Sequence, residues 1–178
     1  MYRAKGMPAA LLMASLQSCF RTEARNGIAH PAETLRAVNR QFYALTEADR
    51  FATLFFGVYD DATRRLRYIN CGHCPPLVRC ASGAEERLDP TASLLGAFAD
   101  WDCAEAEIHI APGDTVLLYS DGVTESTDAL GDEFGEERLA KLLGGTKSAL
   151  EMTNQIVREI TSGWTSTDDA TIAVLRGV

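Results

Sequence analysis

The feature that most constrains the fold is a change in hydrophobic period near residue 50. Before it, apolar residues recur every three or four positions, which predicts helices over about residues 8–25 and 31–45. After it, residues 51–60 are rich in aromatic and β-branched types, and residues 64–72 alternate polar with apolar side chains. The short polar turn between these two segments predicts a β-hairpin. A helix pair followed by a hairpin restricts the chain to folds that combine helices with antiparallel strands.

The rest of the chain repeats this combination of strands and helices. Strands are predicted at about residues 76–80, 104–111, 115–120 and 170–176, and helices at about 136–143 and 148–162. No repeat, low-complexity tract or linker interrupts the pattern. The sequence therefore predicts a single α+β domain over residues 1–178, with helices packed against an antiparallel sheet or sandwich.

Charge and composition exclude several classes of function. The formal net charge is −8, and a chain without a basic surplus does not neutralise nucleic-acid phosphates. No apolar run approaches the ~20 residues of a membrane span. The first predicted helix lacks the cationic lead and the cleavage site of a signal peptide. These features predict a cytoplasmic protein that binds neither nucleic acid nor membrane.

Two cysteine patterns suggest chemistry that their context does not support. Cys71 and Cys74 have the spacing of a dithiol oxidoreductase, but they precede two prolines, whereas a reactive thiol of that kind needs a helix N-terminus. A second ligand pair with zinc-site spacing is missing. Four residues separate Cys74 from Arg79, one fewer than in the phosphate loop of cysteine-dependent phosphatases, and two of the four are prolines without an N–H group. We therefore predict unpaired, non-catalytic cysteines.

A better candidate site lies at the ends of two predicted strands. Asp121 directly follows the apolar strand at 115–120, and Gly122 permits a close approach of backbone. Asp168 and Asp169 directly precede the strand at 170–176. If these two strands are neighbours in the sheet, Asp121 and Asp168 meet at one edge. Carboxylate oxygens suit Mg²⁺ or Mn²⁺.

At this point the sequence resembles a known family. The segments are KGMPAALLMASL, FATLFFGVYDDATRRLRYINCGHCPPLV, GDTVLLYSDGVTES with the following GDEFGEERL, and DDATIAVL. They fall in the order seen in bacterial PPM-type, metal-dependent protein phosphatases of the stage II sporulation protein E branch, which includes regulators of stress sigma factors. The resemblance covers essentially the whole chain. It implies an antiparallel β-sandwich flanked by helix pairs.

The resemblance also implies a metal site. Family members hold two Mn²⁺ or Mg²⁺ ions, and Asp121 and Asp168 match direct ligands of these ions. Asp169 is the neighbouring carboxylate, placed in or just behind the ligand shell. Gly6 matches a glycine that supplies a backbone oxygen. A water activated by the two ions would attack phosphorus without a phosphoenzyme, so no catalytic residue beyond the ligands is expected.

Two further residues are expected near that site in structural roles. Gly122 belongs to the Asp-Gly motif, and His73 lies in the family's Gly-His segment. The implied activity is hydrolysis of phosphoserine or phosphothreonine on an anti-sigma-factor antagonist protein.

The start of the chain departs from the family pattern. Met1 stands where the family has an aspartate that bridges the two metals, so the resemblance implies that the N-terminal strands and their ligands are missing. A misplaced start codon, a decayed gene and a shortened binding module all fit this departure, and we favour a truncated phosphatase sequence. We therefore expect weakened metal binding, little turnover by these residues alone, and exposed sheet edges that favour self-association. The alternative function is a catalytically impaired phosphatase-like binding module.

Overall fold

A computed structural model describes residues 7–24, 29–46, 50–145, 147–166 and 168–178. The chain divides into two compact units. The first comprises residues 1–59, 67–72 and 90–107, and the second comprises residues 60–66, 73–89 and 108–178. The single domain inferred from the sequence stays a prediction. No helix among the described residues is both long and apolar enough to cross a membrane.

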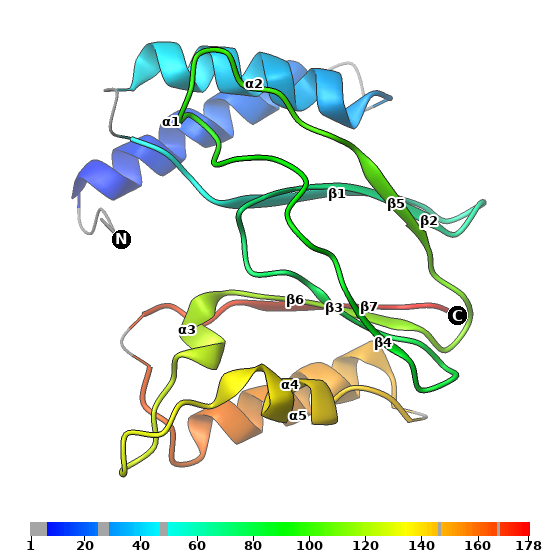
Figure 1. Cartoon of the computed structure of the whole chain (residues 1–178). Helices are drawn as coiled ribbons and strands as arrows, with labels where there is room; N and C mark the ends of the chain where they lie inside the picture. The colour runs from blue at the N-terminus through cyan, green and yellow to red at the C-terminus, as the bar shows by residue number, and fades with distance from the viewer. Residues whose placement is uncertain (1–6, 25–28, 47–49, 146, 167) are drawn as a thin grey trace. The chain divides into compact units, whose positions relative to one another are not determined.

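The first unit packs two helices on a three-stranded sheet (Figure 1). The helices are α1 (Met7–Glu23) and α2 (Pro31–Leu45), and both lie on the same face of the sheet. The strands are β1 (Leu54–Asp60), β2 (Arg65–Cys71) and β5 (Ala106–His109), in the order β1-β2-β5. The bounds of α2 agree with the sequence prediction.

The core of this unit forms where the apolar stripe of α2 meets the sheet. Its buried members are Leu16, Cys19, Leu35, Val38, Phe42, Ile69, Cys71, Leu95, Trp101 and Cys103. Leu35, Val38 and Phe42 are fully buried because their spacing places them on one face of the helix.

A buried asparagine anchors a loop to this core. Asn39 on α2 is 1% exposed, and its Oδ1 accepts the N–H of Gly96 at 2.7 Å. Its Nδ2 donates to the carbonyl oxygen of Phe98 at 3.1 Å. Both polar ends of the side chain are thereby paired, as burial of an amide requires.

We expect Asn39→Ala to lower the free energy of unfolding by about 1–3 kcal/mol, because the N–H of Gly96 would stay buried without an acceptor. Urea unfolding followed by circular dichroism measures the change. The matched control is Asn154→Ala on an exposed helix face, with an expected change within about 0.5 kcal/mol. Equal changes for the two variants would contradict the anchoring role.

The second unit contains a four-stranded antiparallel sheet in the order β4-β3-β6-β7. Its strands are β3 (Leu77–Arg79), β4 (Glu85–Arg87), β6 (Thr115–Tyr119) and β7 (Ile172–Arg176). β6 is central and its burial is nearly continuous, as the apolar run predicts.

Three helices lie on one side of this sheet (Figure 1). They are α3 (Asp121–Thr124), α4 (Gly135–Lys141) and α5 (Ala149–Thr161). A capping box defines the start of α5. The side chain of Ser148 accepts the backbone N–H of Glu151, and the side chain of Glu151 accepts the backbone N–H of Ser148. The core beneath the helices contains Leu77, Leu117, Tyr119, Val123, Phe134, Leu139, Leu143 and Ile156.

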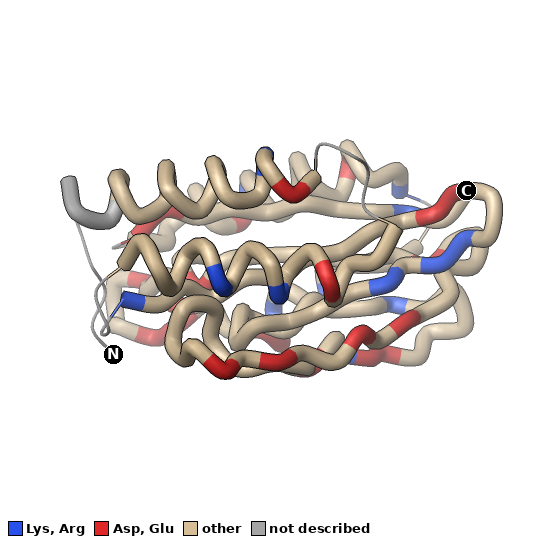
Figure 2. The backbone as a smooth tube through the Cα atoms, turned by 90° about the horizontal axis from the view of Figure 1, so that it is seen from above, with Lys and Arg blue, Asp and Glu red and all other residues tan. Residues whose placement is uncertain are grey.

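Charged residues are distributed along both units. Figure 2 shows both acidic and basic positions along the backbone, and the excess of 25 Asp and Glu over 17 Lys and Arg gives the net charge of −8. The predicted α+β class, with helices packed on antiparallel sheets, is confirmed. Two elements were not predicted from the sequence: β4, whose three residues are all charged and exposed, and α3, which is a single helical turn.

Candidate metal centre

Strand pairing brings the two predicted aspartates to the same edge of the second sheet. β6 and β7 are antiparallel neighbours, and Tyr119 pairs with Ile172. The end of β6 therefore lies beside the start of β7. Asp121 opens α3 just after β6, and Asp168 lies just before β7. The strand adjacency on which the sequence argument depended is present.

Gly122 lets the backbone after β6 pack unusually close to the backbone before β7. A Cβ atom at this position would lie 2.5 Å from the carbonyl oxygen of Asp169 and 3.1 Å from that of Asp168. These are backbone atoms, which cannot move aside as a flexible side chain can. Glycine is therefore required for the turn after β6 to pack against the Asp168–Asp169 segment.

Ser120 lies directly after β6 and hydrogen-bonds to the segment directly before β7. Its Oγ donates to the carbonyl oxygen of Asp169 at 3.1 Å and accepts the N–H of Thr171 at 2.9 Å. The N–H of Ser120 also donates to the carbonyl oxygen of Thr171 at 3.0 Å. One residue therefore makes three hydrogen bonds to the segment that carries the other aspartates.

Ser166 lies before β7 and hydrogen-bonds to the segment directly after β6. Its Oγ lies 2.9 Å from the carbonyl oxygen of Gly122 and 2.5 Å from that of Asp168, and its single proton serves these acceptors. The same oxygen accepts the N–H of Asp168 at 3.2 Å. Neither serine was among the residues predicted from the sequence. The available signal was a serine one or two positions before an aspartate in each motif.

The carboxylates differ in exposure. Asp121 and Asp168 are half-buried, whereas Asp169 is exposed. Oδ1 of Asp168 accepts the N–H of Asp169 at 3.0 Å, which restrains the Asp168 side chain. Asp169 accepts the hydroxyl of Ser120 through its backbone carbonyl oxygen, and the same oxygen lies close to Gly122.

These residues fit part of a divalent-cation shell. Mg²⁺ is usually held by one or two protein carboxylates with waters completing its coordination, and Asp121 and Asp168 are residues of that type on adjoining segments. Among the described residues no group of three or more His, Cys, Asp or Glu side chains could hold a metal ion. Gly6, the predicted backbone ligand, lies outside the described residues.

His73 and Cys74 lie within electrostatic range of Asp121. Burial lowers the pKa of His73, and the negative charge of Asp121 partly opposes this effect. Burial raises the pKa of the Cys74 thiol, and Asp121 raises it further. The neighbourhood therefore disfavours a thiolate at Cys74 and makes it a poor nucleophile.

The described cysteines are free thiols. Burial, and to a smaller extent the electrostatic influence of Cys103, raises the pKa of Cys71 to about 12. Cys71 is therefore neutral throughout the physiological range, and thiolate forms in the folded chain only near pH 12. The free-thiol part of the cysteine prediction is confirmed.

We expect Cys71 to resist alkylation in the native chain at pH 8, because the thiolate is the reactive species and this thiol is fully buried. Iodoacetamide labelling followed by mass spectrometry measures the modified fraction. In urea the same residue should label readily, since its pKa returns toward the ordinary ~8.5. Native labelling of Cys71 at the rate seen in urea would contradict this assignment.

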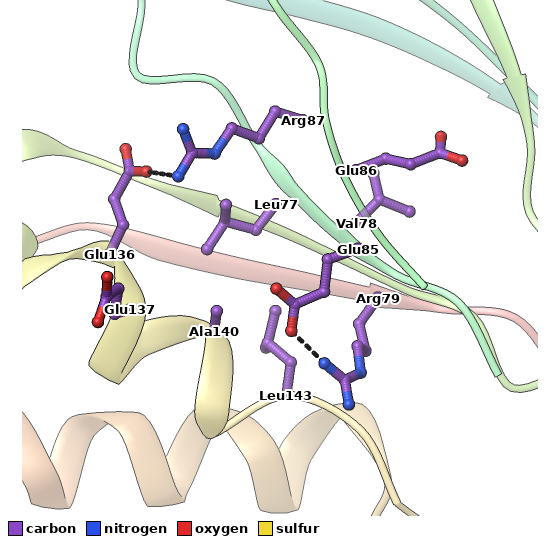
Figure 3. Close-up of a pocket in the computed structure, with 10 residues that line it drawn as sticks. All are labelled: Leu77, Val78, Arg79, Glu85, Glu86, Arg87, Glu136, Glu137, Ala140 and Leu143. Carbon is purple, nitrogen blue, oxygen red and sulfur yellow. Dashed lines mark hydrogen bonds and ion pairs between the residues drawn. The ribbon is translucent and has the colours of Figure 1, made fainter. Parts of the chain in front are cut away.

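A separate pocket of about 410 Å³ lies between the β3–β4 hairpin and α4 (Figure 3). Its lining residues are Leu77, Val78, Arg79, Glu85, Glu86, Arg87, Glu136, Glu137, Ala140 and Leu143. Two ion pairs border it, Arg87 with Glu136 at 2.7 Å and Arg79 with Glu85.

Glu136 is held from the core as well as from β4. Tyr119 on β6 donates its hydroxyl to Oε1 of Glu136 at 2.7 Å. Burial, and then this carboxylate, raises the pKa of Tyr119, so the tyrosine is a neutral donor. The pocket does not include the aspartates. The Arg87–Glu136 ion pair and the Tyr119 hydrogen bond join α4 to the sheet, and the Arg79–Glu85 ion pair joins β3 to β4.

Solved structures define the class of fold. The SiaA-PP2C domain of Pseudomonas aeruginosa is 20% identical, with a TM-score of 0.82 over 97% of this chain and 72% of that chain. The RsbU and RsbW domains of Rv1364c from Mycobacterium tuberculosis are 23% identical, with a TM-score of 0.80 over 99% of this chain and 51% of that chain. RsbX in complex with magnesium is 15% identical, with a TM-score of 0.64 over 96% and 75% of the two chains. The chain has the fold of a PP2C-type phosphatase domain.

The family follows from the sequence comparison. The model of Stage II sporulation protein E (SpoIIE) matches residues 4–177, and the chain belongs to this family. Protein IcfG of Synechocystis is 36% identical over 109 residues, which are 61% of this chain and 17% of that protein. The phosphoserine phosphatase RsbU of Bacillus subtilis is 31% identical over 122 residues, which are 68% of this chain and 36% of that protein. The family resemblance is confirmed, and the chain spans well under half the length of these relatives.

Proposed function

We propose that this chain carries a metal-dependent protein phosphatase site that hydrolyses phosphoserine or phosphothreonine with Mn²⁺ or Mg²⁺. The observation that carries the proposal is the position of Asp121 just after β6 and of Asp168 just before the neighbouring strand β7, with Gly122 packed against the Asp168–Asp169 backbone, in a member of this family. Two similarities support it: RsbU is named a phosphoserine phosphatase, and RsbX was solved with magnesium.

Each proposed residue has a limited task. Asp121 and Asp168 bind the cation through their carboxylate oxygens, with Asp169 beside them and Gly6 as a further expected ligand. A divalent ion held there lowers the pKa of a bound water and stabilises charge on the phosphoryl oxygens. Without a cation, the two carboxylates repel a phosphate dianion. Substrate binding at this edge therefore depends on the metal. Gly122 and His73 shape the surroundings and transfer no proton.

The substrate class we propose is a small phosphorylated protein of the anti-sigma-factor antagonist type, encountered in the cytoplasm. This proposal rests on the relatives. RsbU and RsbP are both named phosphoserine phosphatases, and one solved neighbour combines an RsbU domain with an RsbW domain.

One observation favours a second candidate. The described residues bring together two of the predicted carboxylate ligands and no group of three that could hold a metal ion. A catalytically impaired module that binds the same phosphoprotein without hydrolysing it fits this partial ligand set.

A single assay separates the two candidates. The purified chain is treated with EDTA, dialysed, and mixed with a phosphoserine-labelled antagonist protein with and without Mn²⁺. Phosphate release that requires Mn²⁺ supports the phosphatase. Co-elution with the phosphoprotein without phosphate release supports the binding module. Neither release nor binding would contradict both.

A further inference from the structure

We propose that Ser120 and Ser166 are positioning residues that set the spacing of Asp121 and Asp168 and thereby the affinity for a divalent cation. We call these two residues the serine clasp. The inference rests on the proposed function, because it assigns the clasp to the metal site of that phosphatase.

The clasp is reciprocal. Ser120 follows β6, and its hydroxyl bonds the backbone of Asp169 and Thr171 on the other segment. Ser166 precedes β7, and its hydroxyl lies 2.9 Å from the carbonyl oxygen of Gly122 on the first segment. Each segment thus supplies one hydroxyl to the backbone of the other.

The serines act where the backbone ladder stops. The last ladder bond between the segments is from Ser120 N–H to the carbonyl of Thr171 at 3.0 Å. The next backbone pair between them, within the described residues, is Thr127 with Thr165, at 2.8 and 3.0 Å. Both aspartates lie between these two points. Over that interval the hydroxyls of Ser120 and Ser166 supply hydrogen bonds that link the segments.

Each aspartate is adjacent to an anchored backbone group. Asp121 lies between Ser120 and Gly122, and the Gly122 carbonyl also accepts the hydroxyl of Ser126 at 2.8 Å. The backbone N–H and carbonyl of Asp168 both contact Oγ of Ser166, at 3.2 and 2.5 Å. The hydroxyls therefore restrain the main chain that carries each carboxylate.

Restraint of this kind matters because the two carboxylates carry like charge. Without a cation they repel each other, and a loose backbone would let them separate. A preorganised pair avoids that rearrangement when the ion binds. Removing groups that orient metal ligands typically costs 10–100-fold in affinity. We expect the Mn²⁺ dissociation constant to rise about tenfold in Ser120→Ala and in Ser166→Ala, which is the lower end of that range.

The experiment measures Mn²⁺ binding and folding separately. Electron paramagnetic resonance of free Mn²⁺ gives the dissociation constant, and urea unfolding in EDTA gives the stability of the metal-free chain. The matched control is Ser162→Ala, an exposed serine between α5 and β7 whose side chain makes no hydrogen bond to the described residues. Ser166→Thr keeps the hydroxyl and should retain most of the affinity.

The outcomes distinguish the clasp from the proposed function. Weaker Mn²⁺ binding by both alanine variants, with Ser162→Ala and Ser166→Thr near the parent chain, supports the clasp. If Asp121→Asn abolishes binding while the alanine variants bind like the parent, the clasp is overturned and the proposed site stands. If the alanine variants weaken binding no more than Ser162→Ala does, the clasp is likewise overturned. If the parent chain binds no Mn²⁺, or if Asp121→Asn binds as well as the parent, the metal site itself falls and the clasp with it.

Discussion

Asp121→Asn is expected to abolish measurable Mn²⁺ binding and any Mn²⁺-dependent phosphate release. The substitution replaces a carboxylate with a neutral amide of nearly the same shape. Asp121 is the one predicted carboxylate on the β6 side of this site, whereas Asp168 and Asp169 both lie on the segment before β7 among the described residues. The loss should therefore exceed the ~10–100-fold cost of removing a residue that merely orients a ligand. Titration with Mn²⁺ followed by electron paramagnetic resonance measures it.

The matched control for this variant is Asp132→Asn. Asp132 is exposed in the loop after α3, and its change from carboxylate to amide alters net charge by the same amount. Its affinity for Mn²⁺ should stay close to that of the parent chain. Equal losses for Asp121→Asn and Asp132→Asn would show that general electrostatics, and not ligation, governs the cation.

Gly122→Ala is expected to disrupt the same site from within the backbone. The added Cβ would lie 2.5 Å from the carbonyl oxygen and 2.9 Å from the carbonyl carbon of Asp169. The segment before β7 must then move away, and Asp168 moves with it. Crowding of this kind typically costs about 1–3 kcal/mol of stability. Loss of Mn²⁺ affinity, together with a lower urea midpoint, is the expected result.

Gly83→Ala separates crowding from the general effect of adding a methyl group. At Gly83 a Cβ would meet nothing within 4 Å, although its φ of +94° disfavours alanine. This variant should lose some stability through backbone strain and keep the Mn²⁺ affinity of the parent chain. Mn²⁺ affinity unchanged by Gly122→Ala would refute the close packing of the two segments as a requirement of the site.

Local pattern accounts for the elements that the sequence predicted well. The stripe of Leu35, Val38 and Phe42 repeats at helical spacing, and α2 occurs where that stripe predicts it. The apolar run 115–120 became the central strand β6, because continuous apolar residues are buried on both faces of a sheet. The segments missed were β4 and α3. Neither has a local hydrophobic pattern, because β4 depends on its pairing with β3 and α3 is a single turn.

The sequence by itself determined the class of fold and the family, and it predicts Asp121 and Asp168 as the residues most suited to bind a cation. These depend on residue type, on short-range spacing and on the order of motifs along the chain. Only the tertiary structure decided that β6 and β7 are neighbours, that Gly122 contacts the backbone of Asp169, and that Ser120 and Ser166 bond across the two segments. The physical reason is that these contacts join residues more than 40 positions apart, and pairing over such separations depends on how the whole sheet packs.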